Sequence, residues 1–255
     1  MEVISQNAMY FVVATVIMII LFVWAYVTKR VQKDFSTMTW VLIPVAIAIN
    51  LTVGQIVLVL KLPVYLDSIG TVLVGVICGP WAGALTGALS NIIAGMILDP
   101  GWFPWFPVAA AIGATAGVMA NIGYFKNWWK VAVTGFVIAI VATIVGTPIS
   151  IIVFGGLTAS GSSLITAFLL ETGKGIVASV LTTNFIAEPL DKIATSLLAF
   201  AIIDGLSTRY LSRFPNGENA TVEKGQKQTQ LIVALVIVVL LILFGVYVLP
   251  LITGS

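Results

Sequence analysis

The sequence has few charged residues, no histidine and a single cysteine. Charged side chains make up 9% of its 255 residues, whereas an ordinary soluble domain has about 25%. The lone Cys78 excludes a disulfide within the chain. Without histidine or a second cysteine, the usual metal-ligand spacings are absent, and so is the side chain that most often serves as a general base.

Motifs for nucleotide binding and hydrolysis are missing as well. The chain contains no P-loop, HExxH, GxSxG or glycine-rich dinucleotide turn. We therefore expect no enzyme activity, no metal and no cofactor, and any ATP hydrolysis that drives this protein must take place in a partner. A formal net charge of +2 argues against a nucleic-acid partner.

What the chain does have is apolar sequence, 60% of it, in long runs suited to a lipid bilayer. A helix needs about 20 apolar residues to cross the hydrocarbon layer. Two shorter runs are separated by Gly79-Pro80, where we expect a tight reversal because proline cannot continue a helical ladder. The sequence thus predicts an all-α integral membrane protein with eight spans: 8–27, 39–60, 67–79, 81–98, 104–123, 131–153, 185–205 and 229–250.

The placement of basic residues predicts the orientation. With eight spans, nine of the 12 Lys and Arg residues fall on one side, which the positive-inside rule makes cytoplasmic, and both termini face outward. A ninth span within 154–184 would separate the clusters, so we expect this segment to form a hairpin or re-entrant piece on the outer face. The three clusters are Lys29, Arg30 and Lys33; Lys126 and Lys130; and Arg209, Arg213, Lys224 and Lys227.

Small residues recur every four positions in several spans. In lipid such rows allow helix backbones to approach closely, and rows such as Gly83-xxx-Gly87 favour ordinary packing within the bundle. The row Ala46-xxx-Asn50-xxx-Gly54 in the 39–60 span has two interpretations. It either packs inside the bundle or docks a helix of a partner protein.

Two stretches resemble a known transporter family. They read AIAINLTVGQIV…LKLPVYLDSIGTVLVGVICGPWAGALTGALSN and EPLDKIATSLLAFAI…LSRFP. They are similar to the substrate-binding S components of energy-coupling factor (ECF) transporters, which import vitamins and other micronutrients into prokaryotic cells. The resemblance covers about residues 39–214, and GPWAGALTG is its most distinctive part.

The resemblance implies an organisation and a set of partners. A six-helix substrate-binding core over 38–214 would be flanked by one extra transmembrane helix in 1–37 and another in 215–255, all in the plasma membrane. Such a core binds a small molecule beneath loops at the outer face, while a coupling T subunit and two ABC ATPases supply energy. Members often dock through Ala-xxx-Ala on the first core helix, so Ala46, Asn50 and Gly54 are the partner-docking candidates, although Asn50 departs from that motif.

Polar and aromatic groups near the outer ends of the spans are candidates for substrate binding. Each has an ordinary alternative: helix capping for Asp67 and Asn184, an aromatic belt for the tryptophans, an i, i+3 ion pair for Glu171 with Lys174, and the helix dipole for Glu188 beside Asp191. The candidates are Asp67, Asn91, Trp102, Trp105, Glu171, Lys174, Asn184 and Glu188.

Two functions of different kinds follow. The first is a substrate-capture subunit that imports a small organic micronutrient, such as a vitamin or a nucleobase-like compound, with partner ATPases. The second is a stand-alone secondary transporter or channel, in which buried ionisable residues commonly couple transport to an ion gradient.

Overall fold

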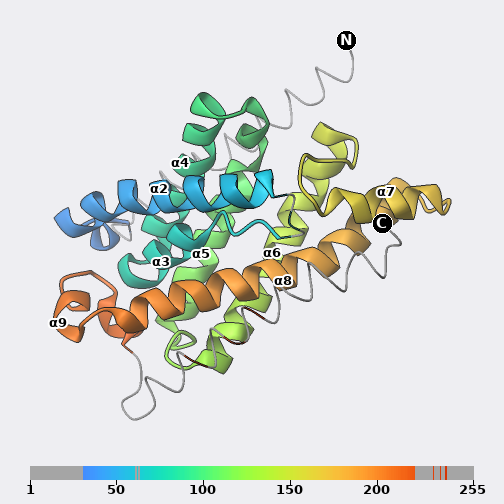
Figure 1. Cartoon of the computed structure of the whole chain (residues 1–255). Helices are drawn as coiled ribbons and strands as arrows, with labels where there is room; N and C mark the ends of the chain where they lie inside the picture. Colours follow the sequence, from blue (N-terminus) through green and yellow to red (C-terminus); the bar gives the residue numbers. More distant parts are fainter. Residues whose placement is uncertain are drawn as a thin grey trace.

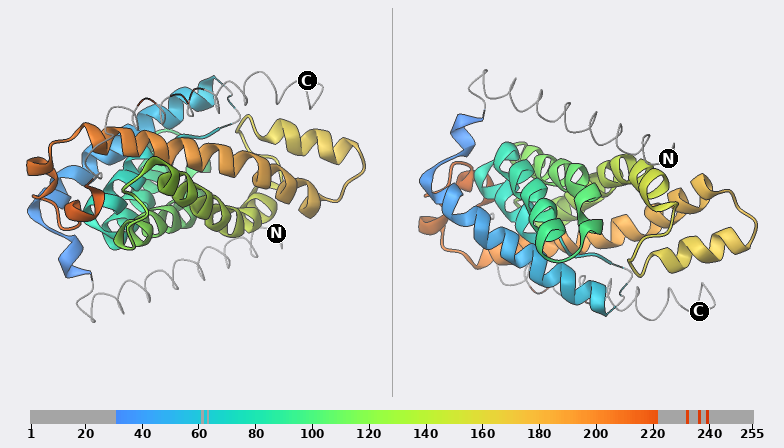
Figure 2. Two further views of the ribbon diagram at one scale, coloured as in Figure 1. Left: turned by 90° about the horizontal axis from the view of Figure 1, so that it is seen from below. Right: turned by 90° about the horizontal axis from the view of Figure 1, so that it is seen from above.

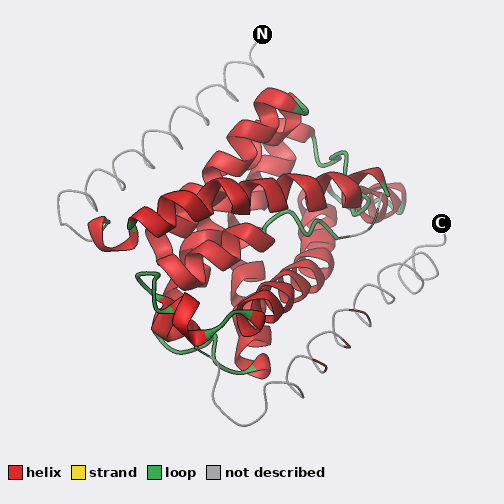
Figure 3. Ribbon diagram, turned by 60° about the vertical axis from the view of Figure 1, so that its left-hand side comes forward, coloured by secondary structure: helices red, strands yellow, loops and turns green. Residues whose placement is uncertain are grey.

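The computed structural model describes residues 31–60, 62 and 64–221, together with positions 232, 236 and 239. These residues form helices joined by short connections and contain no strand (Figure 1, Figure 3). The α-helices are α2 (Thr37–Val59), α3 (Ile69–Cys78), α4 (Pro80–Ile97), α5 (Phe106–Asn121), α6 (Trp128–Phe154), α7 (Ser163–Glu171), α8 (Ile176–Gly205) and α9 (Thr208–Leu211). The 3-10 helices are η1 (Gln32–Asp34), η2 (Pro100–Trp105) and η3 (Gly217–Ala220).

Three of the described helical segments are long and apolar enough to cross a membrane: Thr37–Val59, Pro100–Asn121 and Trp128–Phe154. The second of them joins η2 to α5. The predicted class, an all-α membrane protein, is confirmed at this level. The predicted span 8–27 lies outside the described residues, as does 229–250 apart from three isolated positions.

The predicted reversal at Gly79-Pro80 is confirmed. Helix α3 ends at Cys78 and α4 begins at Pro80. Gly79 between them has a φ of +118°, a backbone conformation that residues with a side chain rarely adopt. The carboxylate of Asp34 accepts a hydrogen bond from the backbone N–H of Trp81 at 3.0 Å. A Cβ on Gly79 would collide with that carboxylate. The turn therefore needs glycine for its backbone angle and for its close contact with Asp34.

Helix α3 occupies the centre of the bundle, since all ten of its residues are buried. It packs against α2, α4, α5 and α8. Where α3, α4 and α5 meet, a Cβ on Gly83 would lie 2.5 Å from the Cα of Gly75 and 2.6 Å from the carbonyl oxygen of Gly113. The small-residue rows of α4 and α5 thus pack helix against helix, as predicted.

The partner-docking candidates Ala46, Asn50 and Gly54 are all buried. Ala46 and Asn50 are 0% and 1% exposed, and the Cα of Gly54 faces Asp67 across a gap too small for a Cβ. The row faces α3, where Gly70 lies directly against the backbone of Ala46. This burial favours the internal-packing interpretation of the row over docking of a partner helix, and the docking role stays a prediction.

The helix predicted at 185–205 begins earlier, at Ile176, and runs for 30 residues. Gly175 is its N-cap, so Asn184 lies inside the helix and the capping explanation for that residue is wrong. The segment 154–184 forms a hairpin of α7 and the start of α8, where the hydroxyl of Thr166 donates to that of Thr183 at 2.8 Å. Figure 2 shows this hairpin extending from one end of the bundle.

The opposite end is closed by the chain that follows α8. The backbone N–H and the side-chain amide of Asn216 donate to the carbonyls of Ile77 and Val76, at the end of α3. The Asn219 amide donates to Asn121 at the end of α5, at 3.2 Å. Because Asp34 also contacts the α3–α4 turn, the chain segments that carry Lys33, Lys126 and Arg209 all meet at this end.

Candidate ligand-binding cavity

A cavity of about 550 Å³ lies at the end of the bundle where the α7–α8 hairpin is found. The connection between α2 and α3, η2 and the loop from α6 to α7 supply much of its wall, and α5, α6 and α8 supply most of the rest. Residues far apart in the sequence therefore line one cavity. Its volume lies within the range of about 300–1,000 Å³ that is typical of small-molecule sites.

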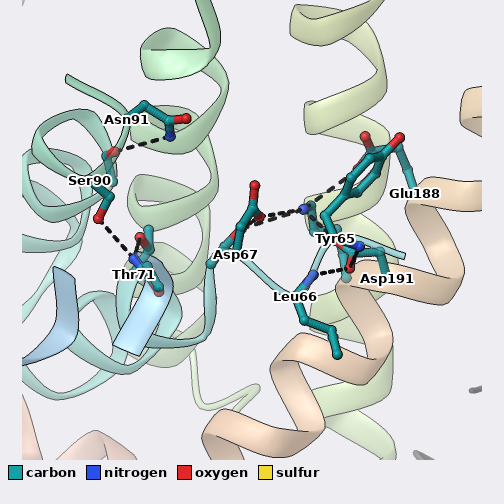
Figure 4. A network of polar contacts seen from close by, with 12 residues as sticks. Tyr65, Leu66, Asp67, Thr71, Ser90, Asn91, Glu188 and Asp191 are labelled. Atoms are coloured by element: carbon teal, nitrogen blue, oxygen red, sulfur yellow. Dashed lines mark hydrogen bonds and ion pairs between the residues drawn. The ribbon is translucent and has the colours of Figure 1, made fainter. Parts of the chain in front are cut away.

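Six of the eight substrate-binding candidates line this cavity: Asp67, Asn91, Trp102, Trp105, Asn184 and Glu188. Figure 4 shows Asp67 between Asn91 on one side and Glu188 on the other. The remaining two, Glu171 and Lys174, are exposed at the turn between α7 and α8 and do not line the cavity. The structure does not bring these two side chains to the cavity, because α7 ends at Glu171 and both are exposed.

Four ionisable side chains in and behind the cavity wall form what we call the Lys192 cluster. The ammonium Nζ of Lys192 lies 2.5 Å from a carboxylate oxygen of Asp191, 3.8 Å from one of Asp67 and 3.9 Å from one of Glu188. Lys192 is 3% exposed and Asp191 is 0% exposed. One buried ammonium is thus shared by three carboxylates, an arrangement that requires close pairing because unpaired charges are costly in a low-dielectric interior.

The helix dipole does not explain why acidic residues lie in this cluster. Glu188 and Asp191 lie in the middle of α8, well beyond its first turn, so the helix dipole does not account for them. The sequence predicted Glu188 as a site residue but not Asp191 or Lys192. The i, i+4 spacing of Glu188 and Lys192 was the available signal, because such residues share a helix face.

Asp191 also fixes the connection between α2 and α3. One of its carboxylate oxygens accepts hydrogen bonds from the backbone N–H groups of Tyr65 and Leu66, each at 2.7 Å. Leu66 has a φ of +49°, an uncommon left-handed conformation for a residue with a side chain. Since Asp67 follows directly, this contact places the Asp67 carboxylate beside Lys192.

Tyr65 joins the same connection to the loop before α7. Its hydroxyl shares a hydrogen bond with that of Ser162 at 2.8 Å, and its ring lies 5.4 Å from the ammonium of Lys192. Burial raises the pKa of the Tyr65 phenol, and the nearby Glu188 carboxylate adds to the effect. Tyr65 therefore stays protonated and serves as a neutral part of the wall.

Two aromatic residues of the 99–107 loop, Trp102 and Trp105, contribute to the apolar part of the cavity wall. Trp105 stacks on Phe154 with ring centroids 5.4 Å apart and ring planes 11° from parallel. Trp102 packs against Gly54 of α2, where a Cβ would lie 3.2 Å from the indole ring. Both indoles line the cavity, which favours the ligand-wall interpretation over a simple aromatic belt at the lipid surface.

The described part of the chain is thus all-helical, with helices suited to a membrane and a cavity whose wall mixes polar and aromatic groups. The described residues include no group of three or more metal-ligating side chains suited to a metal ion. The chain matches no family model, no curated protein sequence and no solved structure.

Proposed function

We propose that this chain is the substrate-capture subunit of an ECF-type importer for a small organic micronutrient. The observation that carries the proposal is the cavity itself, which combines aromatic walls with a few polar groups at one end of a helical bundle. Pockets of this kind favour small organic ligands, because apolar area supplies affinity while placed polar groups supply orientation.

The arrangement of the chain supports this family of transporters. Helices α2, α3, α4, α5, α6 and α8 supply the six core helices that the resemblance implies, with α7 as part of the predicted hairpin. The connection after α2, the first of the six, carries Tyr65 and Asp67 to the cavity. In an S component, the corresponding loop closes over the bound molecule.

We extend the proposal to the membrane topology. The chain crosses a prokaryotic plasma membrane eight times, with the cavity at the outer face and both termini outside. Support comes from the basic residues Lys33, Lys126 and Arg209, whose chain segments meet at the end of the bundle opposite the cavity. That end is then cytoplasmic. It faces the coupling T subunit and two ABC ATPases, which supply the energy that this chain lacks.

Co-purification tests the proposal. A tagged chain extracted from its native membrane should bring down a coupling subunit and two ATPases, and uptake should stop when ATP hydrolysis is blocked. If the chain purifies alone and transports solute in liposomes under an ion gradient, it is not an ECF subunit.

A stand-alone secondary transporter is the second candidate, and the Lys192 cluster is the observation that favours it. Buried carboxylates in transmembrane helices often bind the coupling proton or ion in such proteins. Here, however, the ammonium of Lys192 occupies the position between the three carboxylates that a small coupling ion would need. We therefore place this candidate second.

A further inference from the structure

The cavity wall contains hydrogen-bond acceptors that are not used by the protein. Three buried oxygens of the cavity lining accept no hydrogen bond from the described residues: Oε1 of Gln55, Oδ1 of Asn91 and Oε2 of Glu188. The Glu188 oxygen is the one that lies 3.9 Å from the ammonium of Lys192, beyond hydrogen-bond distance. Because a buried acceptor without a partner is costly, a molecule that fills the cavity is expected to donate hydrogen bonds to it.

The orientation of the Asn91 amide supports this assignment. Asn91 is 5% exposed, and its amide nitrogen faces the carbonyl oxygen of Gly87 at 3.5 Å. A carbonyl can only accept, so the amide nitrogen belongs on that side and the amide oxygen on the other. Figure 4 shows this oxygen turned away from the contact. The free group of Asn91 is therefore an acceptor.

The charges of the site favour the same kind of ligand. The Lys192 cluster holds three carboxylates and one ammonium, a net charge of −2 when all four are ionised. Lys192 is the only basic residue in the cavity lining within the described part of the chain, and it is already surrounded by acids. The carboxylates of Asp67 and Glu188 would repel an anionic ligand and attract a cationic one.

A bare metal ion does not fit this arrangement. The carboxylates of Asp67, Glu188 and Asp191 converge on the ammonium of Lys192, which occupies the position that a metal would need. The indoles of Trp102 and Trp105 and the aliphatic side chains beside them offer no ligand to a hard cation. They provide contact area for an organic group.

We infer that the cavity binds a small organic cation with several N–H donors and a flat or apolar body. The body lies against Trp102 and Trp105, and the protonated nitrogen group faces Glu188 and Asp67, with a further donor to Asn91. Cations are also attracted to the faces of indole rings. The inference rests on the proposed function, since it requires this cavity to be a capture site.

Three compounds with one ring system and different charges test the inference. Tryptamine, tryptophol and indole-3-propionate carry an ammonium, a hydroxyl and a carboxylate on the same two-carbon chain. Equilibrium dialysis against the purified full-length protein at neutral pH should show tryptamine binding about tenfold or more tighter than either of the others. Native mass spectrometry of the freshly purified protein should show that any retained compound is a cation.

The variant Glu188→Gln removes one charge without changing the size of the side chain. Its affinity for tryptamine should fall by about tenfold or more, as for loss of a charged hydrogen-bond partner, while its affinity for tryptophol changes little. Glu171→Gln makes the same chemical change at an exposed position outside the cavity and should leave all three affinities unaltered. If Glu188→Gln does not fold, Asp67→Asn at the partly exposed edge of the cluster replaces it.

The outcomes separate this inference from the proposed function. Tighter binding of indole-3-propionate, or retention of an anionic compound, would overturn the inference and leave capture of a small molecule intact. Equal changes in tryptamine affinity for Glu188→Gln and Glu171→Gln would also overturn the inference and leave the proposed function intact. If the wild-type protein binds none of the three compounds and retains no other, the cavity does not capture small organic molecules, and the proposed function fails as well.

Discussion

Asp191 and Leu66 are 125 positions apart in the sequence, yet the Asp191 carboxylate accepts a hydrogen bond from the Leu66 backbone at 2.7 Å. The same oxygen binds the N–H of Tyr65. Through this contact, α8 holds the α2–α3 connection in a conformation that its own sequence does not favour, since Leu66 has a positive φ. The shape of the cavity wall therefore depends on a single buried carboxylate.

We predict that Asp191→Asn destabilises the protein by about 3 kcal/mol, because it leaves the buried ammonium of Lys192 without its closest counter-charge. Unfolding in mixed detergent micelles measures this free energy. The double variant Asp191→Asn/Lys192→Gln should recover part of the loss. An Asp191→Asn protein as stable as the exposed control Glu171→Gln would show that the pair does not hold the fold together.

Asn50→Ala should cost about 1–3 kcal/mol of stability. The Asn50 amide donates to the hydroxyls of Thr71 and Ser90 and accepts from the backbone N–H of Gly70, so it joins α2 to α3 and α4. Ser90→Ala removes only one of these bonds and should cost less. If Asn50→Ala unfolds like the wild type but loses a partner protein, the residue docks that partner and the buried contacts are unimportant.

Gly113→Ala should lower the free energy of unfolding by about 1–3 kcal/mol through overpacking. An added Cβ would collide with the backbone of Gly83 on α4, and neither helix can move without disturbing α3. Gly205→Ala is the control, because this glycine is also helical, at the end of α8, and has no atom within 4 Å of a built Cβ. Thermal unfolding should distinguish the two, and equal melting temperatures would contradict close α4–α5 packing.

The stability of the protein should fall as the pH rises above about 10, and Tyr65 should account for part of the fall. Burial raises the pKa of its phenol above the ordinary 10.0, so the unfolded chain ionises first and unfolding becomes easier. Below pH 10 this contribution is fully present. Tyr65→Phe should lose about 1 kcal/mol at pH 8 with the Ser162 hydrogen bond, and its stability should decline less steeply toward pH 11. Parallel pH profiles for the two proteins would be evidence against a buried phenol.

Thiol labelling tests the membrane orientation. In a Cys78→Ala background, a membrane-impermeant maleimide should modify Lys126→Cys and Arg209→Cys only after the cells are permeabilised. Lys174→Cys, at the turn of the α7–α8 hairpin, should react in intact cells. The wild-type protein is the control, because its single cysteine, Cys78, is buried and should not react. Labelling of Lys126→Cys and Arg209→Cys from opposite sides would contradict the eight-span topology.

Much of the fold could be predicted from local properties of the chain. Long apolar runs require lipid as their surroundings, and a Gly-Pro pair in the middle of such a run ends one helix and begins the next. The reversal between α3 and α4 was predicted to within one residue, and Asp67 and Asn91 line the same cavity, as expected. These features depend on hydropathy and backbone chemistry within a few turns of helix.

Other features required the three-dimensional arrangement. Which face of α2 turns inward depends on Gly70 of α3, so sequence alone left Asn50 equally suited to packing and docking. The true start of α8 placed Asn184 and Glu188 inside a helix, and it brought Lys192 between acids from two segments. Sequence periodicity tells which residues must avoid lipid, but a buried charge is stabilised by the atoms around it, and tertiary packing decides which atoms those are.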